Sequence, residues 1–193
     1  MGLVVTGVDP ALGGGFALLT ADLGDKLTIL DCSVTYDLSK TEEQLFLIEN
    51  CARVYRPNLL IVEFDAQQKG LGNDDRLRDI SHRYAFNIRP HTTRNNKADA
   101  IFGVASMDQS FKTGEIRIPW GDDTTRNRMG PLVNQLRAWR PDIKTKNLTQ
   151  DCVMSLWFVW RYWRQMLKQH EPDAAPAWRP SWVGGYNPYV RAS

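Results

Sequence analysis

Three acidic residues stand where apolar segments of the sequence begin or end. Asp9 follows the apolar residues 3–8, Glu63 follows residues 58–62, and Asp151 opens a long apolar segment. A carboxylate at the rim of a core is unfavourable unless it is paired, and two neighbouring carboxylates repel each other. Mg²⁺ or Mn²⁺ removes that conflict, because hard cations prefer oxygen ligands. If the three acids converge, the sequence therefore predicts a divalent metal site.

A cluster of carboxylates suits phosphodiester hydrolysis. Two ions about 3.5–4 Å apart activate a water and stabilise the leaving 3′ oxygen of an in-line displacement. Carboxylates bridge two ions, which imidazole does not, and we expect Asp9 to be the bridging ligand. Asp65, two residues after Glu63, is an auxiliary candidate. A zinc hydrolase is not favoured, because no metal-ligand spacing relates the three histidines, His82, His91 and His170.

Each acid also has a purely structural interpretation. Asp9 precedes Pro10 and can be a turn former. Glu63 can pair with a lysine or arginine, and Asp151 can be an N-terminal helix acid favoured by the helix dipole. The order of the three acids, and of the elements around them, favours a shared site.

The elements around these acids follow an α/β pattern. Residues 3–8, 16–19 and 26–34 indicate three successive strands. A helix then begins at Thr41 and is ended by Pro57, and residues 58–62 indicate a fourth, buried strand. A crossover of this kind predicts a mixed central sheet, a three-strand meander followed by parallel strands, flanked by α-helices.

The rest of the chain completes one domain and a tail. We expect further strands at 86–89 and 115–119, and helices at 74–84, 96–111, 124–139 and 148–168. The domain spans residues 1–168. Residues 169–193 are rich in proline and aromatic residues and are interpreted as an extended tail, draped or disordered or partner-binding: Trp178, Trp182, Tyr186 and Tyr189.

Composition and charge indicate a soluble globular protein with a polarised surface. Hydrophobic residues make up 42% and charged residues 24% of the 193 residues, and no segment predicts a signal peptide or a membrane span. Three cysteines without a CxxC spacing favour a reducing cytoplasm. Residues 1–65 carry 4 Lys/Arg and 10 Asp/Glu, whereas residues 66–193 carry 20 and 12. This asymmetry suits an acidic metal site beside a phosphate-binding surface.

Positive charge is densest within residues 124–146, our candidate for a phosphate track along DNA: Arg126, Arg128, Arg137, Arg140, Lys144 and Lys146. Arg94 and Lys97 form a second candidate. Phosphate contacts give affinity without reading the base sequence. The plainer alternative is a solvated helix face followed by a cationic loop.

Several motifs are shared with a known family. G-V-D-P at 7–10, followed by a glycine-rich turn, and I-V-E-F-D at 61–65 match its first two motifs, and Asp151 matches the second aspartate of its third. Lys97 and residues 114–119 and 132–136 add weaker similarities. The acids in this order resemble the ribonuclease H-like nucleases. More narrowly, about residues 3–165 resemble the C-terminal nuclease domain of the large terminase subunit of tailed bacteriophages.

This resemblance implies a ribonuclease H-like fold and a metal-dependent DNA endonuclease. Asp9, Glu63 and Asp151 would be the catalytic ligands of two Mg²⁺ or Mn²⁺ ions, with Lys97 as an auxiliary residue. The implied reaction is cleavage of double-stranded concatemeric viral DNA during genome packaging. The implied partners are that DNA, an ATPase domain of the same full-length protein, the small terminase subunit and the portal, in the host-cell cytoplasm at the procapsid.

Departures from the family pattern keep other functions open. Thr149 and Gln150 replace the usual histidine and first aspartate of the third motif, so the sequence does not supply the fourth metal ligand of the family. It also contains no GxxxxGK[ST] motif, which an ATPase half would carry. A Holliday-junction resolvase of the same fold is one alternative, although such enzymes carry a second acid or histidine three residues from the last-helix acid, where this chain has Leu148 and Met154. A non-catalytic DNA-binding or capsid-docking module is another. A sugar-kinase-like ATPase is disfavoured, because it needs a second, larger lobe.

Overall fold

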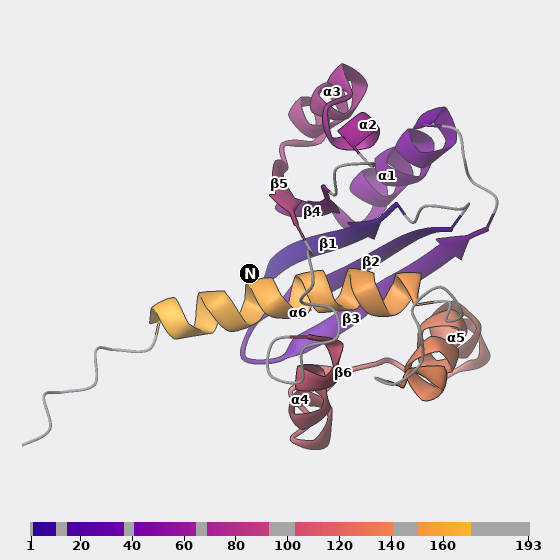
Figure 1. Ribbon diagram of the computed structural model, residues 1–193, viewed down its shortest axis with the longest axis vertical. Helices are drawn as coiled ribbons and strands as arrows, with labels where there is room; N and C mark the ends of the chain where they lie inside the picture. Colours follow the sequence, from indigo (N-terminus) through magenta and orange to yellow (C-terminus); the bar gives the residue numbers. More distant parts are fainter. Residues whose placement is uncertain are drawn as a thin grey trace, which may run out of the picture.

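A mixed β-sheet runs through the centre of the protein. The computed structural model describes residues 2–10, 15–36, 41–64, 69–92, 103–140 and 150–170. Six strands lie in the order β5-β4-β1-β2-β3-β6 (Figure 1). Their bounds are β1 Leu3–Asp9, β2 Phe16–Leu23, β3 Leu27–Thr35, β4 Leu59–Glu63, β5 Asn87–His91 and β6 Ile116–Arg117.

The pairing of the strands confirms the expected topology. β1, β2 and β3 form the antiparallel meander, while β4 lies parallel to β1 and β5 parallel to β4. At the other edge, β6 is parallel to β3 but pairs over two residues only. The predicted strand at 115–119 is therefore longer than the structure supports.

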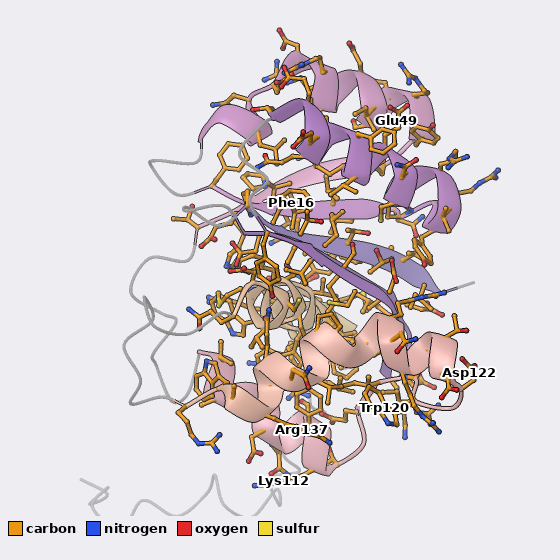
Figure 2. All side chains as sticks on the ribbon, turned by 90° about the vertical axis from the view of Figure 1, so that its right-hand side faces the viewer. Phe16, Glu49, Lys112, Trp120, Asp122 and Arg137 are labelled. Carbon is orange, nitrogen blue, oxygen red and sulfur yellow. The ribbon has the colours of Figure 1, made fainter. Side chains whose placement is uncertain are left out.

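Helices cover both faces of the sheet, as the α/β pattern predicts. Their bounds are α1 Thr41–Tyr55, α2 Lys69–Gly72, α3 Asp75–Tyr84, the 3₁₀ helix η2 Val104–Met107, α4 Asp108–Lys112, α5 Asp123–Ala138 and α6 Asp151–His170. In Figure 2, α1 and α3 lie above the sheet and α4, α5 and α6 lie below it. No helix among the described residues is long and apolar enough to cross a membrane.

Local signals explain where several helices begin and end. The Asp74 carboxylate accepts from the backbone N–H of Arg76, which fixes the start of α3 one residue from the predicted position, and α3 ends at Ala85 in a left-handed conformation. Asp122 starts α5 with a reciprocal capping box to Thr125. The helix predicted at 96–111 differs: the described part is the short η2 followed by α4, and residues 96–102 lie outside the described chain.

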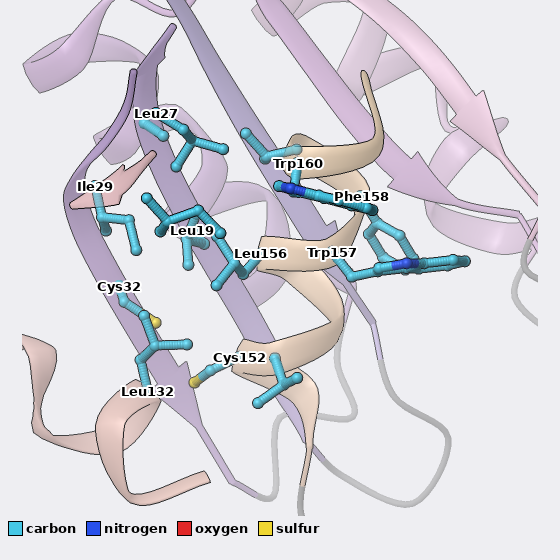
Figure 3. Packing of buried hydrophobic residues seen from close by; sticks show 14 of the residues in the cluster. Leu19, Leu27, Ile29, Cys32, Leu132, Cys152, Leu156, Trp157, Phe158 and Trp160 are labelled. Carbon is cyan, nitrogen blue, oxygen red and sulfur yellow. The ribbon is translucent and has the colours of Figure 1, made fainter. Parts of the chain in front are cut away.

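The core is divided by the sheet into two clusters. One face packs α1 and α3 against residues such as Val8, Leu18 and Val62. The opposite face packs α6 against Val5 and Ile61. Residues 152–160 of α6 are buried, and Figure 3 shows their side chains interleaved with those of the strands. The α6 tryptophans, Trp157, Trp160 and Trp163, are therefore core residues.

One glycine sets how closely α6 approaches the sheet. A Cβ atom placed on Gly7 of β1 would lie 2.3 Å from the carbonyl oxygen of Ser155 in α6. Real Cβ atoms do not approach an oxygen so closely, so any larger residue at this position forces the helix or the strand to move. Gly7 therefore permits the backbone of α6 to rest directly on β1.

Candidate active site at the carboxyl edge of the sheet

Asp9 and Glu63 end two neighbouring parallel strands. Val8 pairs with Val62, so the two acids are the next residues of β1 and β4. Neighbouring strands are about 4.8 Å apart, and the carboxyl ends of parallel strands meet at one edge of the sheet. Asp9 is 3% and Glu63 1% exposed. The structure thus brings these two predicted ligands side by side in a buried position.

Both acids belong to the face of the sheet that α6 covers. Successive side chains of a strand point to opposite faces, so Asp9 shares a face with Val5, and Glu63 shares a face with Leu59 and Ile61. Val5, Leu59 and Ile61 all belong to the core cluster under α6. The two carboxylates therefore lie at the end of the packed interface between the sheet and that helix.

The direction of α6 follows from two hydrogen bonds. Ser155 Oγ donates to the carbonyl oxygen of Ala17 (3.2 Å) at the start of β2, and Trp163 Nε1 donates to the carbonyl oxygen of Gly24 (2.9 Å) after its end. The helix therefore runs along β2 and antiparallel to β1, as Figure 1 shows. Its N-terminus lies at the carboxyl edge of β1.

This direction brings Asp151 to the same end of the molecule as Asp9 and Glu63. Asp151 is the first residue of α6, one turn before Ser155, whose partner Ala17 is paired with Asp9 across the sheet. The three acids, far apart in the sequence, thus converge on one edge. Asp151 is half-buried.

The donor set has the ligand chemistry of a hard divalent cation, but the described side chains do not form a metal site. Asp9, Glu63 and Asp151 offer only carboxylate oxygens, which is the ligand chemistry of Mg²⁺ and Mn²⁺. Within the described ranges, no group of three or more His, Cys, Asp or Glu side chains is gathered closely enough to hold a metal ion. Two adjacent buried acids and a third at the same edge are what the structure provides.

His91 is a neighbour of this site that the sequence analysis did not select. It ends β5 and pairs in register with Glu63, on the same face of the sheet. Its ring lies 5.4 Å from that of Trp157 and 4.7 Å from that of Phe158, both in α6. The spacing of the histidines in the sequence does not indicate that His91 lies next to Glu63, because this depends on which strand pairs with β4.

The predicted phosphate track is described only in part. Arg126 and Arg128 of α5 form ion pairs with Asp123 (3.1 Å) and Asp31 (3.4 Å). Burial raises the pKa of the Asp31 carboxyl, and Arg128 opposes that shift. The other described members, Arg137 and Arg140, are exposed. The remaining predicted residues lie outside the described chain: Asp65, Arg94, Lys97, Lys144 and Lys146.

Two arginines outside that track contact aromatic side chains of α6. Arg89 is on β5, two residues before His91 and on the same face, and its guanidinium lies 5.2 Å from the ring of Tyr162 in α6. Arg161 of α6 lies similarly over Trp157, at 5.3 Å. Aromatic contacts hold these two arginines against side chains of α6.

Comparison with known proteins identifies the fold. No protein-family model and no curated protein matches the sequence. Among solved structures, the Holliday junction resolvase of fowlpox virus matches with a TM-score of 0.51 and 11% identity over 85% of this chain and 99% of that chain. The fold is ribonuclease H-like. RuvC of Thermus thermophilus has a TM-score of 0.47 and 13% identity over 86% of this chain and 96% of that chain. At these identities the similarity concerns the fold alone.

Proposed function

We propose that this protein is a Mg²⁺- or Mn²⁺-dependent DNA endonuclease with Asp9, Glu63 and Asp151 as its metal ligands. The observation that supports this most is the pairing of β1 with β4, which sets two buried carboxylates side by side on the face of the sheet that α6 covers. A cation pair bound there supplies water activation and stabilisation of the leaving 3′ oxygen. The ribonuclease H-like fold is consistent with this chemistry.

The residues around the acids have separate tasks in this proposal. Asp9 ends the strand that lies between β4 and β2, and it would be the ligand shared by the two ions. Asp65 and Lys97 are auxiliary residues. DNA phosphates contact the basic residues predicted from the sequence: Arg94, Lys97, Arg126, Arg128, Arg137, Arg140, Lys144 and Lys146. Such contacts position a duplex without selecting its sequence.

We favour double-stranded viral concatemers as the substrate, because the motifs resemble those of large terminase subunits. In that setting the chain acts with an ATPase domain of the same full-length protein, a small terminase subunit and a portal, at the procapsid in the host-cell cytoplasm. Three residues after Asp151, where junction resolvases carry a second acid or histidine, this chain has the fully buried Met154. That difference favours the packaging role.

The proposed activity is tested by plasmid cleavage in Mn²⁺ with isosteric variants. Asp9→Asn, Glu63→Gln and Asp151→Asn should each abolish cleavage while the circular dichroism spectrum and melting temperature stay near those of the wild type. Asp25→Asn, an exposed acid in the turn between β2 and β3, is the matched control and should cleave normally. Full activity in the three site variants would reject the proposal.

A Holliday-junction resolvase is the second candidate, because the chain shares its fold with the fowlpox virus resolvase over nearly the whole of that protein. The two functions differ in substrate preference. A packaging nuclease should cut linear duplex at least as readily as a four-way junction. Symmetric paired nicks in a junction, with little cutting of linear duplex, would replace the packaging proposal with the resolvase. A third outcome, DNA binding without any metal-dependent cutting, would identify a non-catalytic DNA-binding or capsid-docking module.

A further inference from the structure

The first turn of α6 is held by a side chain from another helix. Oε1 of Gln135, in α5, accepts the backbone N–H of Cys152 (2.9 Å) and that of Val153 (3.4 Å). The first N–H groups of any α-helix have no partner within the helix. A capping residue from the chain just before the helix usually supplies one. In α6 the described acceptor comes instead from a residue that is 17 positions earlier in the sequence.

The identity of the contacting atom is fixed by its partners. Both neighbours are N–H donors, so the atom that faces them is the carbonyl oxygen of the Gln135 amide and not its nitrogen. Gln135 is 6% exposed, and its Nε2 is buried with no hydrogen-bond partner among the described residues. A buried donor in that state is unfavourable. The two hydrogen bonds accepted by Oε1 offset the cost of burying Nε2. A leucine or methionine at this position would avoid that cost but could not accept these hydrogen bonds.

The packing around Gln135 makes this contact rigid. Met129, Leu132 and Gln135 are the buried residues of α5, and Leu132 lies beside Cys152 in the core, as Figure 3 shows. Neither Leu132 nor Cys152 is exposed to solvent. The amide of Gln135 is therefore held at a fixed point relative to the start of α6.

Asp151 immediately precedes the two residues that Gln135 holds. We infer that Gln135 is a positioning residue for Asp151: by capping Cys152 and Val153 it keeps the third carboxylate at the edge occupied by Asp9 and Glu63. Gln135 touches neither DNA nor metal in this role. The inference rests on the proposed metal centre for its consequence, but the cap itself is a property of the metal-free protein.

Two substitutions distinguish the effect of the capping hydrogen bonds from the effect of side-chain size and shape. Gln135→Met has a similar length and cannot accept a hydrogen bond, whereas Gln135→Glu retains an acceptor oxygen. In the metal-free protein, amide hydrogen exchange at Cys152 and Val153, followed by NMR, should become about fivefold faster in Gln135→Met, as loss of one net hydrogen bond predicts. Exchange in Gln135→Glu should remain close to that of the wild type.

The effect of the cap on metal binding by Asp151 is measured by titrating each variant with Mn²⁺ in a calorimeter. Gln135→Met should need about tenfold more Mn²⁺ for half-saturation, the usual effect of removing a group that orients a ligand. Gln135→Glu should need no more than the wild type. Leu132→Val, which loosens the same helix contact without touching the hydrogen bonds, should lower the melting temperature and leave the Mn²⁺ requirement unchanged.

The outcomes are decisive in each case. Unchanged exchange or unchanged Mn²⁺ half-saturation in Gln135→Met would overturn the positioning role, and so would a Gln135→Glu protein that behaves like Gln135→Met. If Leu132→Val raises the Mn²⁺ requirement as much as Gln135→Met, general loosening of the interface replaces the specific cap. A wild-type protein that binds no Mn²⁺ overturns this inference, whereas one that binds Mn²⁺ without cutting DNA overturns only the proposed nuclease activity.

Discussion

The two faces of the sheet both carry ion pairs at their surface, but among the described residues buried carboxylates occur only on the α6 face. On the layer formed by α1 and α3, ion pairs join exposed side chains, as in the pairs of Arg76 with Glu42 (3.0 Å) and of Arg83 with Glu49. On the face under α6, the carboxylates of Asp9 and Glu63 are buried at the carboxyl edge. Exposed pairs contribute little to stability, whereas buried acids are unfavourable unless the site compensates them. Burial therefore distinguishes the candidate site better than the number of charges does.

The sharpest test of this contrast replaces one glutamate on each face. Glu63→Gln should lower DNA cleavage more than about 100-fold. Changing a residue that only orients a metal ligand costs at most about 100-fold, and loss of the ligand itself should cost more. Glu42→Gln, on the α1 layer, should change cleavage by less than about twofold, because an exposed ion pair contributes only about 0–1 kcal/mol. Initial rates on supercoiled plasmid measure both. Equal effects of the two variants would remove the distinction between the faces.

Two histidine variants, one beside Glu63 and one on α3, extend the comparison with a smaller expected effect. His91→Ala should reduce cleavage by about 10–100-fold, because His91 lies in register with Glu63 and packs against α6. His82→Ala, an exposed histidine on α3, should leave the rate near that of the wild type. Initial rates on supercoiled plasmid measure both variants. A His91→Ala protein with normal cleavage would limit the site to the three acids.

The close approach of α6 is tested by a pair of glycine variants. Gly7→Ala places a methyl group 2.3 Å from the Ser155 carbonyl oxygen and should destabilise the protein by about 1–3 kcal/mol, the usual range for overpacking. Gly130→Ala in α5 meets nothing within 4 Å and should stabilise by up to about 1 kcal/mol, as helix propensity predicts. Urea denaturation measures both. A tolerated Gly7→Ala would show that the helix does not rest on β1 as described.

The smallest predicted effect concerns an ion pair of the α1 and α3 layer. Arg83→Ala removes the contact with Glu49 and should reduce the free energy of unfolding by about 0.2–1 kcal/mol, less at high salt. Cleavage should be unaffected. Urea denaturation at two salt concentrations provides the comparison. A loss of several kcal/mol would mean that this layer depends on its charges as strongly as the other face does on its core.

The mixed sheet and the first two acids were accessible from the sequence. An apolar, β-rich run that breaks into a carboxylate identified Asp9 and Glu63, and the crossover before the fourth strand predicted a mixed sheet. That β4 pairs with β1 was not predicted and is a finding of the structure. The last helix was predicted as well, with Asp151 in its first turn. These features are local in the sequence, or follow from general rules of connection between strands.

Other parts of the site depend on contacts that no local pattern encodes. His91 adjoins Glu63 only because β5 pairs with β4, and Gln135 caps α6 only because α5 packs against it. The shortness of β6 and the division of residues 104–112 into η2 and α4 were not predicted, since tertiary packing overrides weak local preferences. The assignments of the metal ligands, the phosphate track and the C-terminal tail stay predictions.

Binding of Mn²⁺ to the metal-free protein tests the central claim most directly. Calorimetric titration of the wild type should show saturable heat, and the isosteric Asp9→Asn variant should lose it while its melting temperature stays within a few degrees of that of the wild type. Saturable Mn²⁺ binding that persists unchanged in Asp9→Asn would contradict the account, because the edge where β1, β4 and α6 meet would then not be the place where the cation is held.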